Sequence, residues 1–201
     1  MEDLIALFST PEGVAAQCVG FVAMGVALFM FAFRTRKRIL FAKLIADALW
    51  VVHYLLLGAA SGAVINAINV AREGVFYHKE KKWASGILWP ILFVIANVVS
   101  TFFSWQGWIS LLPLLGSSVN VLALWCASPR RMRILAIPAL SLWVVYSVLV
   151  GSIPSVLVNS FSIISALYGL LRDAAERSAQ RSLETKAVSK DKNTKKKGEF
   201  Q

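Results

Sequence analysis

Charged residues are scarce in this chain, and two long stretches contain none. The 201 residues are 57% hydrophobic and only 16% charged, whereas an ordinary soluble domain has about 25% charged residues. Residues 83–129 and 134–171 lack Lys, Arg, Asp and Glu entirely. So few polar groups cannot cover the surface of a soluble fold, and a helix needs about 20 apolar residues to cross a bilayer. The composition therefore excludes a soluble domain and predicts an integral membrane protein.

Further absences narrow the function. The two cysteines, Cys18 and Cys126, are too few for a disulfide framework or a metal site. The chain has no P-loop and no catalytic Ser/His/Asp set at a plausible depth, so we expect no enzyme and no cofactor. Its net charge of +10 lies between and after the apolar stretches, which argues against a nucleic-acid partner. No Lys or Arg precedes Arg34, unlike the start of a cleaved signal peptide.

Glycine, proline, serine and charged residues divide the chain into seven apolar runs. Backbone groups inside lipid need internal hydrogen-bond partners, so each run is expected to form a helix. The runs cover residues 13–33, 39–58, 61–78, 84–103, 106–126, 133–151 and 153–171. The sequence therefore predicts an all-α membrane protein with seven transmembrane helices.

Positive charges predict the orientation of these helices. Of the 21 Lys and Arg residues, 19 fall on one side, in alternate loops and in the tail, and the other two, Lys43 and Arg72, lie within the runs. Positive loops stay in the cytoplasm, so we expect the N-terminus outside and the C-terminus inside. Residues 173–201 are polar and Lys-rich and are expected to form a disordered cytoplasmic tail. This tail either sets topology and solubility or touches anionic lipid.

Two segments 93 residues apart are similar to each other. Residues 49–66 read LWVVHYLLLGAASGAVIN, and residues 142–159 read LWVVYSVLVGSIPSVLVN. The identical positions include Trp50 with Trp143, Gly58 with Gly151, and Asn66 with Asn159. This similarity indicates an internal repeat of three helices.

The repeat predicts the organisation of the whole chain. Three spans reverse the direction of the chain, so a fourth helix must precede a second triplet that starts on the same side. We therefore predict two parallel three-helix repeats, residues 1–78 and 105–172, joined by a linker helix within residues 79–104. Parallel repeats of this kind occur in transporters, with the substrate site between them near the midplane. A duplicated scaffold without a transport role is the alternative.

Short apolar motifs carry a family resemblance over about residues 13–172. The segments GAVINAI, LLPLLGSSVNVLALWC and LWVVYSVLVGSIPSVLVNSF resemble YgjV-like bacterial inner membrane proteins. The arrangement of three, one and three helices is similar to that of the SWEET and PnuC small-solute transporters. The resemblance implies a multi-pass protein of the bacterial inner membrane that binds a small polar solute. The chain lacks the Pro-Gln pair typical of SWEET proteins, so their sugar substrates are not carried over.

The same resemblance implies four cavity residues. SWEET-like proteins line their central cavity with a tryptophan and an asparagine from each triplet, and the matching positions are Trp50, Asn66, Trp143 and Asn159. A buried amide is costly unless it is hydrogen-bonded, so the two asparagines either bind a polar solute or join helices. The two tryptophans either stack on a ring-shaped solute or fill the core.

Four charged residues fall inside the predicted spans of the first repeat. Lys43 and Asp47 are four residues apart, hence on one helix face, and Arg72 and Glu73 should lie at a similar depth on the next helix. We expect Arg72 to pair with Asp47 and Glu73 with Lys43. Charged residues within a bilayer usually face the interior of the helix bundle and take part in function. They either gate or couple transport, or form a static salt-bridge cluster.

His53 lies one turn beyond Trp50 and aligns with Tyr146 in the repeat. It could contact a solute or shuttle a proton, or it could sit at the membrane interface. Together these features predict a transporter that moves a small polar solute by alternating access between the repeats. The alternative is a non-transporting receptor or assembly factor on the same fold. We expect lipid to surround the protein, and the sequence is compatible with a homo-oligomer.

Overall fold

The computed structural model describes residues 10–29, 33, 35–126 and 128–198, and within them the chain is all-α. The α-helices are α2 (Pro11–Phe29), α3 (Arg36–Leu56), α4 (Ala60–Tyr77), α5 (Leu88–Phe103), α6 (Leu111–Trp125), α7 (Pro129–Leu149) and α8 (Ile153–Gly198). Two short 3-10 helices, η2 (Lys82–Ala84) and η3 (Trp108–Ser110), precede α5 and α6. Each predicted run overlaps one of these seven helices, although the end of the first run falls partly outside the described residues.

Five helical segments are long and apolar enough to cross a membrane: α2, α3, α7, α8, and α6 taken together with the preceding η3. The other two are α5, an apolar helix of 16 residues, and α4, an 18-residue helix that carries Arg72 and Glu73. These charges lower the hydropathy of α4 but are buried inside the protein. Large apolar side chains face outward, as on Phe102, Phe103 and Leu171, which is the surface that lipid requires.

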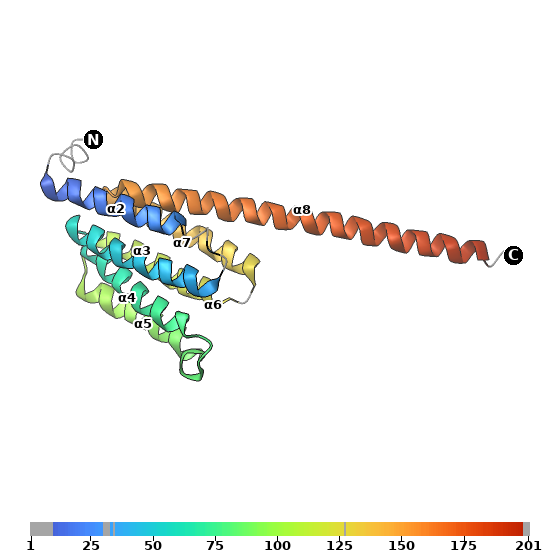
Figure 1. Cartoon of the computed structure of the whole chain (residues 1–201), viewed down its shortest axis with the longest axis horizontal. Coiled ribbons are helices and arrows are strands. Elements are labelled where there is room, and N and C mark those ends of the chain that lie inside the picture. The colour runs from blue at the N-terminus through green and yellow to red at the C-terminus, as the bar shows by residue number, and fades with distance from the viewer. Residues whose placement is uncertain (1–9, 30–32, 34, 127, 199–201) are drawn as a thin grey trace.

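The helices pack as two groups of three, with α5 beside them (Figure 1). Helix α3 packs against both α2 and α4, and we call these three helices the first triplet. Helix α7 packs against both α6 and α8, which form the second triplet. The triplets meet where α2 contacts α8 and where α4 contacts α6, while α5 packs against α4 and α6. The core of the molecule therefore lies between the two triplets.

Matching turns connect the second and third helix of each triplet. Gly58 and Gly151, which are 93 residues apart, have φ angles of 68° and 73°, in the left-handed region that glycine adopts without steric cost. The amide after each glycine, at Ala59 and Ser152, donates to the carbonyl five residues earlier at 2.8 Å. This is the Schellman ending of a helix. It directs α4 and α8 back along the preceding helices.

The C-terminal segment differs from the sequence prediction. Residues 173–198 were predicted to be disordered, but α8 continues as one helix of 46 residues to Gly198. Figure 1 shows its C-terminal part projecting well beyond the other helices. This part is rich in Ala, Arg, Lys and Glu, which all favour helix. Low apolar content therefore excluded a packed core here but did not exclude helix.

Candidate functional site

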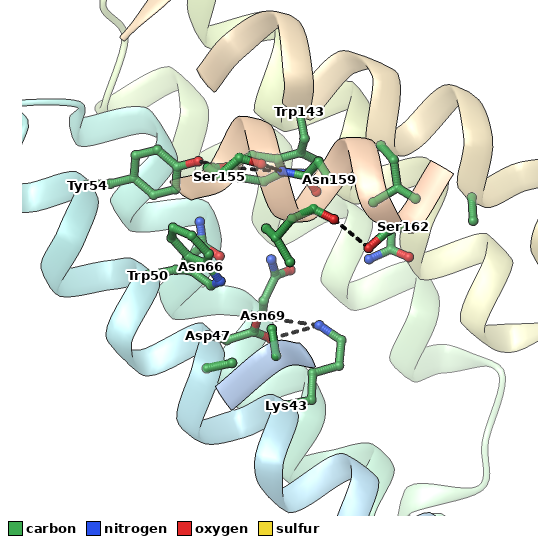
Figure 2. Close-up of a pocket in the computed structure, with 16 residues that line it drawn as sticks. Lys43, Asp47, Trp50, Tyr54, Asn66, Asn69, Trp143, Ser155, Asn159 and Ser162 are labelled. Atoms are coloured by element: carbon green, nitrogen blue, oxygen red, sulfur yellow. Dashed lines mark hydrogen bonds and ion pairs between the residues drawn. The ribbon is translucent and has the colours of Figure 1, made fainter. Parts of the chain in front are cut away.

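A cavity of about 250 Å³ lies between the two triplets (Figure 2). Twelve of the lining residues form six pairs separated by 93 positions. The pairs are Ala27 with Asn120, Lys43 with Ala136, Asp47 with Leu140, Trp50 with Trp143, Asn66 with Asn159, and Asn69 with Ser162. The cavity therefore draws corresponding positions from both halves of the chain.

The two repeated asparagines have the same fixed orientation. Asn66 Nδ2 donates to the Gly62 carbonyl at 2.8 Å, and Asn159 Nδ2 donates to the Ser155 carbonyl at 2.8 Å. Because a carbonyl only accepts hydrogen bonds, each amide must turn its nitrogen toward its own helix. Across the described residues, neither Oδ1 accepts a hydrogen bond from the protein. Each asparagine therefore presents an acceptor oxygen to the cavity.

Aromatic rings form the wall beside these amides. Trp50 and Trp143 are 8% and 9% exposed, and the ring of Tyr54 lies between them, 6.1 Å and 5.9 Å from their centroids. Neither indole N–H has a protein acceptor within the part of the chain that the structure describes. The sequence implied that Trp50, Trp143 and the two asparagines would meet, and the structure brings all four to one cavity. The resulting surface combines flat rings with both donors and acceptors.

His53 and Tyr146 are fully buried and do not line the cavity. His53 Nδ1 lies 2.7 Å from the carbonyl of Ala16, and Nε2 lies 2.6 Å from Ser152 Oγ. Because that carbonyl only accepts, a neutral His53 carries its hydrogen on Nδ1 and accepts from Ser152. Tyr146 Oη accepts from the Gly62 amide at 2.8 Å. Each ring therefore links the two triplets instead of reaching the proposed solute site.

Two glutamines add crossed hydrogen bonds at the same end of the molecule. Gln17 of the first triplet donates to the Gly151 carbonyl at 2.8 Å. Gln106, which precedes the second triplet, donates to the Gly58 carbonyl at 2.9 Å. Each glycine turn is therefore held by a side chain from the opposite half of the chain. We call these the turn latches. The sequence reasoning missed both glutamines, and the repeated glycines were the signal that could have found them.

A hydroxyl cluster closes the cavity near these latches. Tyr54 Oη lies 2.8 Å from Ser155 Oγ, which is 2.7 Å from Ser147 Oγ. Asn159 Nδ2 also donates to Ser155 Oγ at 3.0 Å. Tyr54, Ser147 and Ser155 are all at most 2% exposed. This end of the cavity is therefore sealed by a dense set of side-chain hydrogen bonds.

The four charged residues Lys43, Asp47, Arg72 and Glu73, which the sequence predicted to lie within the membrane, are near the opposite end. Lys43 Nζ is 3.1 Å from Asp47 and 3.4 Å from Glu73, and Arg72 Nη2 is 3.0 Å from Glu73. The predicted pair of Lys43 with Glu73 is present, whereas Arg72 bonds its neighbour Glu73 rather than Asp47. Lys43 and Asp47 line the cavity, but Arg72 and Glu73 lie behind them, 1% and 0% exposed. Among the residues that the structure describes, Arg72 Nη1 and Glu73 Oε2 have no hydrogen-bond partner.

The two ends of the cavity differ in accessibility. The Lys43 side chain is 24% exposed, and Asn120 and Ser162 are also partly exposed. The hydroxyl cluster at the other end is buried. Figure 2 shows Tyr54 and Ser155 toward one end and Lys43 toward the other. The cavity is therefore more open on the charged side. Within the described residues, no group of three His, Cys, Asp or Glu side chains could hold a metal ion.

Apolar helices of membrane-spanning length around a polar cavity define a polytopic α-helical membrane protein. The Imp-YgjV family, described as bacterial inner membrane protein, matches residues 14–177. The chain belongs to this family and is therefore a multi-pass protein of the bacterial inner membrane type. No curated protein and no solved structure matches the chain.

Proposed function

We propose that this protein moves a small polar solute across the bacterial inner membrane by alternating access between two parallel three-helix repeats. In this arrangement, similar to that of SWEET and PnuC transporters, the first and second triplets are the repeats and α5 is the linker. Helices α4 and α5 then also cross the bilayer. The observation that carries the proposal is a polar cavity lined by six pairs of residues at the repeat offset of 93. The shared turns at Gly58 and Gly151 support the same arrangement.

The chemistry of the cavity favours an uncharged solute rich in hydrogen-bond donors. Asn66 and Asn159 each offer an acceptor oxygen, and the indoles of Trp50 and Trp143 offer flat surfaces for a ring. Lys43 is the cation that lines the cavity, and its ammonium already contacts two carboxylates. An anionic solute would have to compete with both carboxylates for it. A neutral ring with hydroxyl or N–H groups fits without that competition.

The unequal ends of the cavity support alternating access. The hydroxyl cluster and the turn latches close one end, while the end beside Lys43 is accessible. With the basic loops in the cytoplasm, the open end faces the cytoplasm and the closed end faces outward. Movement of one triplet against the other would break the latches at the outer end. At the inner end, the charged cluster of Lys43, Asp47, Arg72 and Glu73 would then either close the cavity or couple the transport cycle.

Ligand-dependent stability tests this proposal. The full chain, purified in detergent, is heated with individual sugars, nucleosides, vitamins, amino acids and organic acids. A solute that binds the native state raises the unfolding temperature, and we expect one neutral class to do so. The double variant Asn66→Ala, Asn159→Ala should lose that stabilisation. The solute identified in this way is then tested for uptake into liposomes.

Asn97→Ala is the matched control for the asparagine variant. Asn97 is a fully buried asparagine on α5 that lies outside the cavity, and its side-chain amide has no hydrogen-bond partner in the described part of the chain. Its replacement should leave ligand stabilisation unchanged. If the double variant retains full stabilisation by a solute that is transported, the site lies elsewhere. If no solute discriminates the variants, the cavity is not a binding site and the transport proposal fails.

The long C-terminal helix supports a second candidate function, a non-transporting receptor or assembly factor. Helix α8 extends to Gly198, far past the other helices, and such a helix could engage a protein partner. Deletion of residues 179–201 distinguishes the two functions. A transporter should keep its uptake activity without this segment, whereas a receptor or assembly factor that acts through it should lose function while remaining folded.

A further inference from the structure

A second cavity, of about 840 Å³, lies along α2 and α3 on the outer surface of the first triplet. Gly25 and Phe29 of α2 line it with Phe41 and Ile45 of α3. Phe29, Phe41 and Ile45 are exposed, so this cavity is an open apolar groove. It is separate from the polar cavity between the triplets and shares no lining residue with it.

One end of the groove is basic. Lys37 and Arg38, in the first turn of α3, also line the groove. Lys37 forms an exposed ion pair with Glu80 at 3.5 Å, whereas Arg38 has no carboxylate partner among the residues that the structure describes. From Arg38 to Ile45, α3 rises about 10 Å at 1.5 Å per residue. The groove therefore runs from the cation of Arg38, at the N-terminal end of α3, toward the apolar middle of that helix.

We propose that this groove binds one anionic phospholipid, with its phosphate at Arg38 and Lys37 and an acyl chain along Gly25, Phe29 and Phe41. An arginine fork pairs well with phosphate oxygens, and basic pockets beside membrane helices bind lipid headgroups. Gly25 leaves the floor of the groove open, because a Cβ built there meets nothing within 4 Å. A phospholipid matches both the apolar length and the charged end of the groove.

The second triplet provides a natural contrast. Arg131 occupies the position 93 residues after Arg38, but the aromatic walls are not repeated. Phe29, Phe41 and Tyr77 correspond to Leu122, Ile134 and Leu170, and the open Gly25 corresponds to Ser118. The exposed arginine is thus present in both triplets, while the groove residues belong to the first. Arg131→Gln is therefore a matched control for Arg38→Gln.

Native mass spectrometry of the full chain tests the charged end of the groove. Phosphatidylglycerol and phosphatidylcholine with the same acyl chains are added separately, and occupancy of the first bound lipid is compared. We expect phosphatidylglycerol to be favoured at least threefold. Arg38→Gln should remove this preference, and Arg131→Gln should retain it. Equal losses in the two variants would mean a diffuse basic surface and would overturn the proposal, as would equal binding of both lipids to the unmodified chain.

Gly25→Leu tests the apolar part of the groove independently. Its side chain enters open space, so the variant should fold, yet it fills the proposed path of the acyl chain. Occupancy of the first lipid should fall severalfold. Gly74→Leu, another site where a Cβ meets no neighbour and which lies outside the groove, should leave occupancy unchanged. Soluble glycerophosphoglycerol should not compete with the lipid; complete competition would identify a phosphate site without a chain groove.

Discussion

The two triplets have matching turns and hydrogen bonds at one end of the central cavity and different residues at the other end. At the shared end, Gly58 and Gly151 make the same turn, and Asn66 and Asn159 bond their own helices in the same way. At the other end, the first triplet carries four charged residues at positions where the second carries none. These are Lys43, Asp47, Arg72 and Glu73, which correspond to Ala136, Leu140, Ser165 and Ala166. The closed end of the cavity is therefore built from corresponding residues of both triplets, whereas the four charged residues belong to the first triplet alone.

This difference separates features that both triplets need in order to fold from features that only the first triplet carries. The shared turns satisfy backbone groups at the ends of α3 and α7 that would be costly to leave unpaired in a membrane. The charges have no such obligation, because the second triplet folds with apolar residues and serine at the same positions. Buried ion pairs often add little net stability. We therefore expect the charged cluster to matter for function more than for folding, provided that it is kept or removed as a whole.

Removing one member of the charged cluster should have the largest effect. Glu73→Ala leaves the buried Arg72 guanidinium and Lys43 without their shared carboxylate. Breaking a buried pair in this way costs about 3–5 kcal/mol, so thermal unfolding in detergent should fall sharply. Ala166→Gly, at the corresponding position of the second triplet, should cost only about 1 kcal/mol. Equal destabilisation by the two changes would show that the cluster is not held by Glu73.

Transferring the second triplet's residues to the first sharpens the comparison. The quadruple variant Lys43→Ala, Asp47→Leu, Arg72→Ser, Glu73→Ala leaves none of these four charges buried. It should recover at least about 2 kcal/mol relative to Glu73→Ala, since replacing a whole buried network is often neutral or stabilising. Transport of the solute identified by the stability screen should be lost if the cluster gates or couples. If this stable variant still transported the solute fully, the charged cluster would be a static salt-bridge cluster with no role in gating or coupling.

The sequence predicted the helices and the cavity residues better than their connections. Apolar runs located the seven helices. The resemblance to SWEET proteins implied that Trp50, Trp143, Asn66 and Asn159 line one cavity, and all four do so. The Lys43 and Glu73 pair was also predicted. Orientation in the membrane remains a prediction from the basic loops.

Other features depended on three-dimensional detail that spacing does not contain. Arg72 bonds its neighbour Glu73 because both side chains point into the same buried space, and sequence position alone does not give side-chain direction. His53 and Tyr146 align in the repeat, yet they bond opposite helices rather than the cavity. The helical tail was missed because polar composition was taken as evidence of disorder.

An added methyl group at Gly62 should break the shared end of the cavity. A Cβ at this position would lie 2.6 Å from the Tyr146 hydroxyl, too close for real contacts. Overpacking of this kind costs about 1–3 kcal/mol, so Gly62→Ala should lower the thermal unfolding temperature by several degrees. Gly25→Ala, where a Cβ meets nothing, should gain about 0.5–1 kcal/mol from helix propensity. A loss at Gly25 equal to that at Gly62 would mean that helix-wide effects, not the Tyr146 contact, set the cost.

Replacing either glutamine of the turn latches should have the smallest effect on stability, and that effect should be confined to one turn. Gln17→Leu removes a hydrogen bond worth about 0.5–1.5 kcal/mol, and Gln106→Leu should cost less because Gln106 is exposed and water can replace it. Each latch crosses between the halves of the chain. Gln17→Leu should therefore speed amide hydrogen exchange at residues 151–156 and spare 58–63, and Gln106→Leu should do the reverse. If each change instead loosened both turns equally, the seal would open as one unit, and the two triplets would not be held by independent crossed latches.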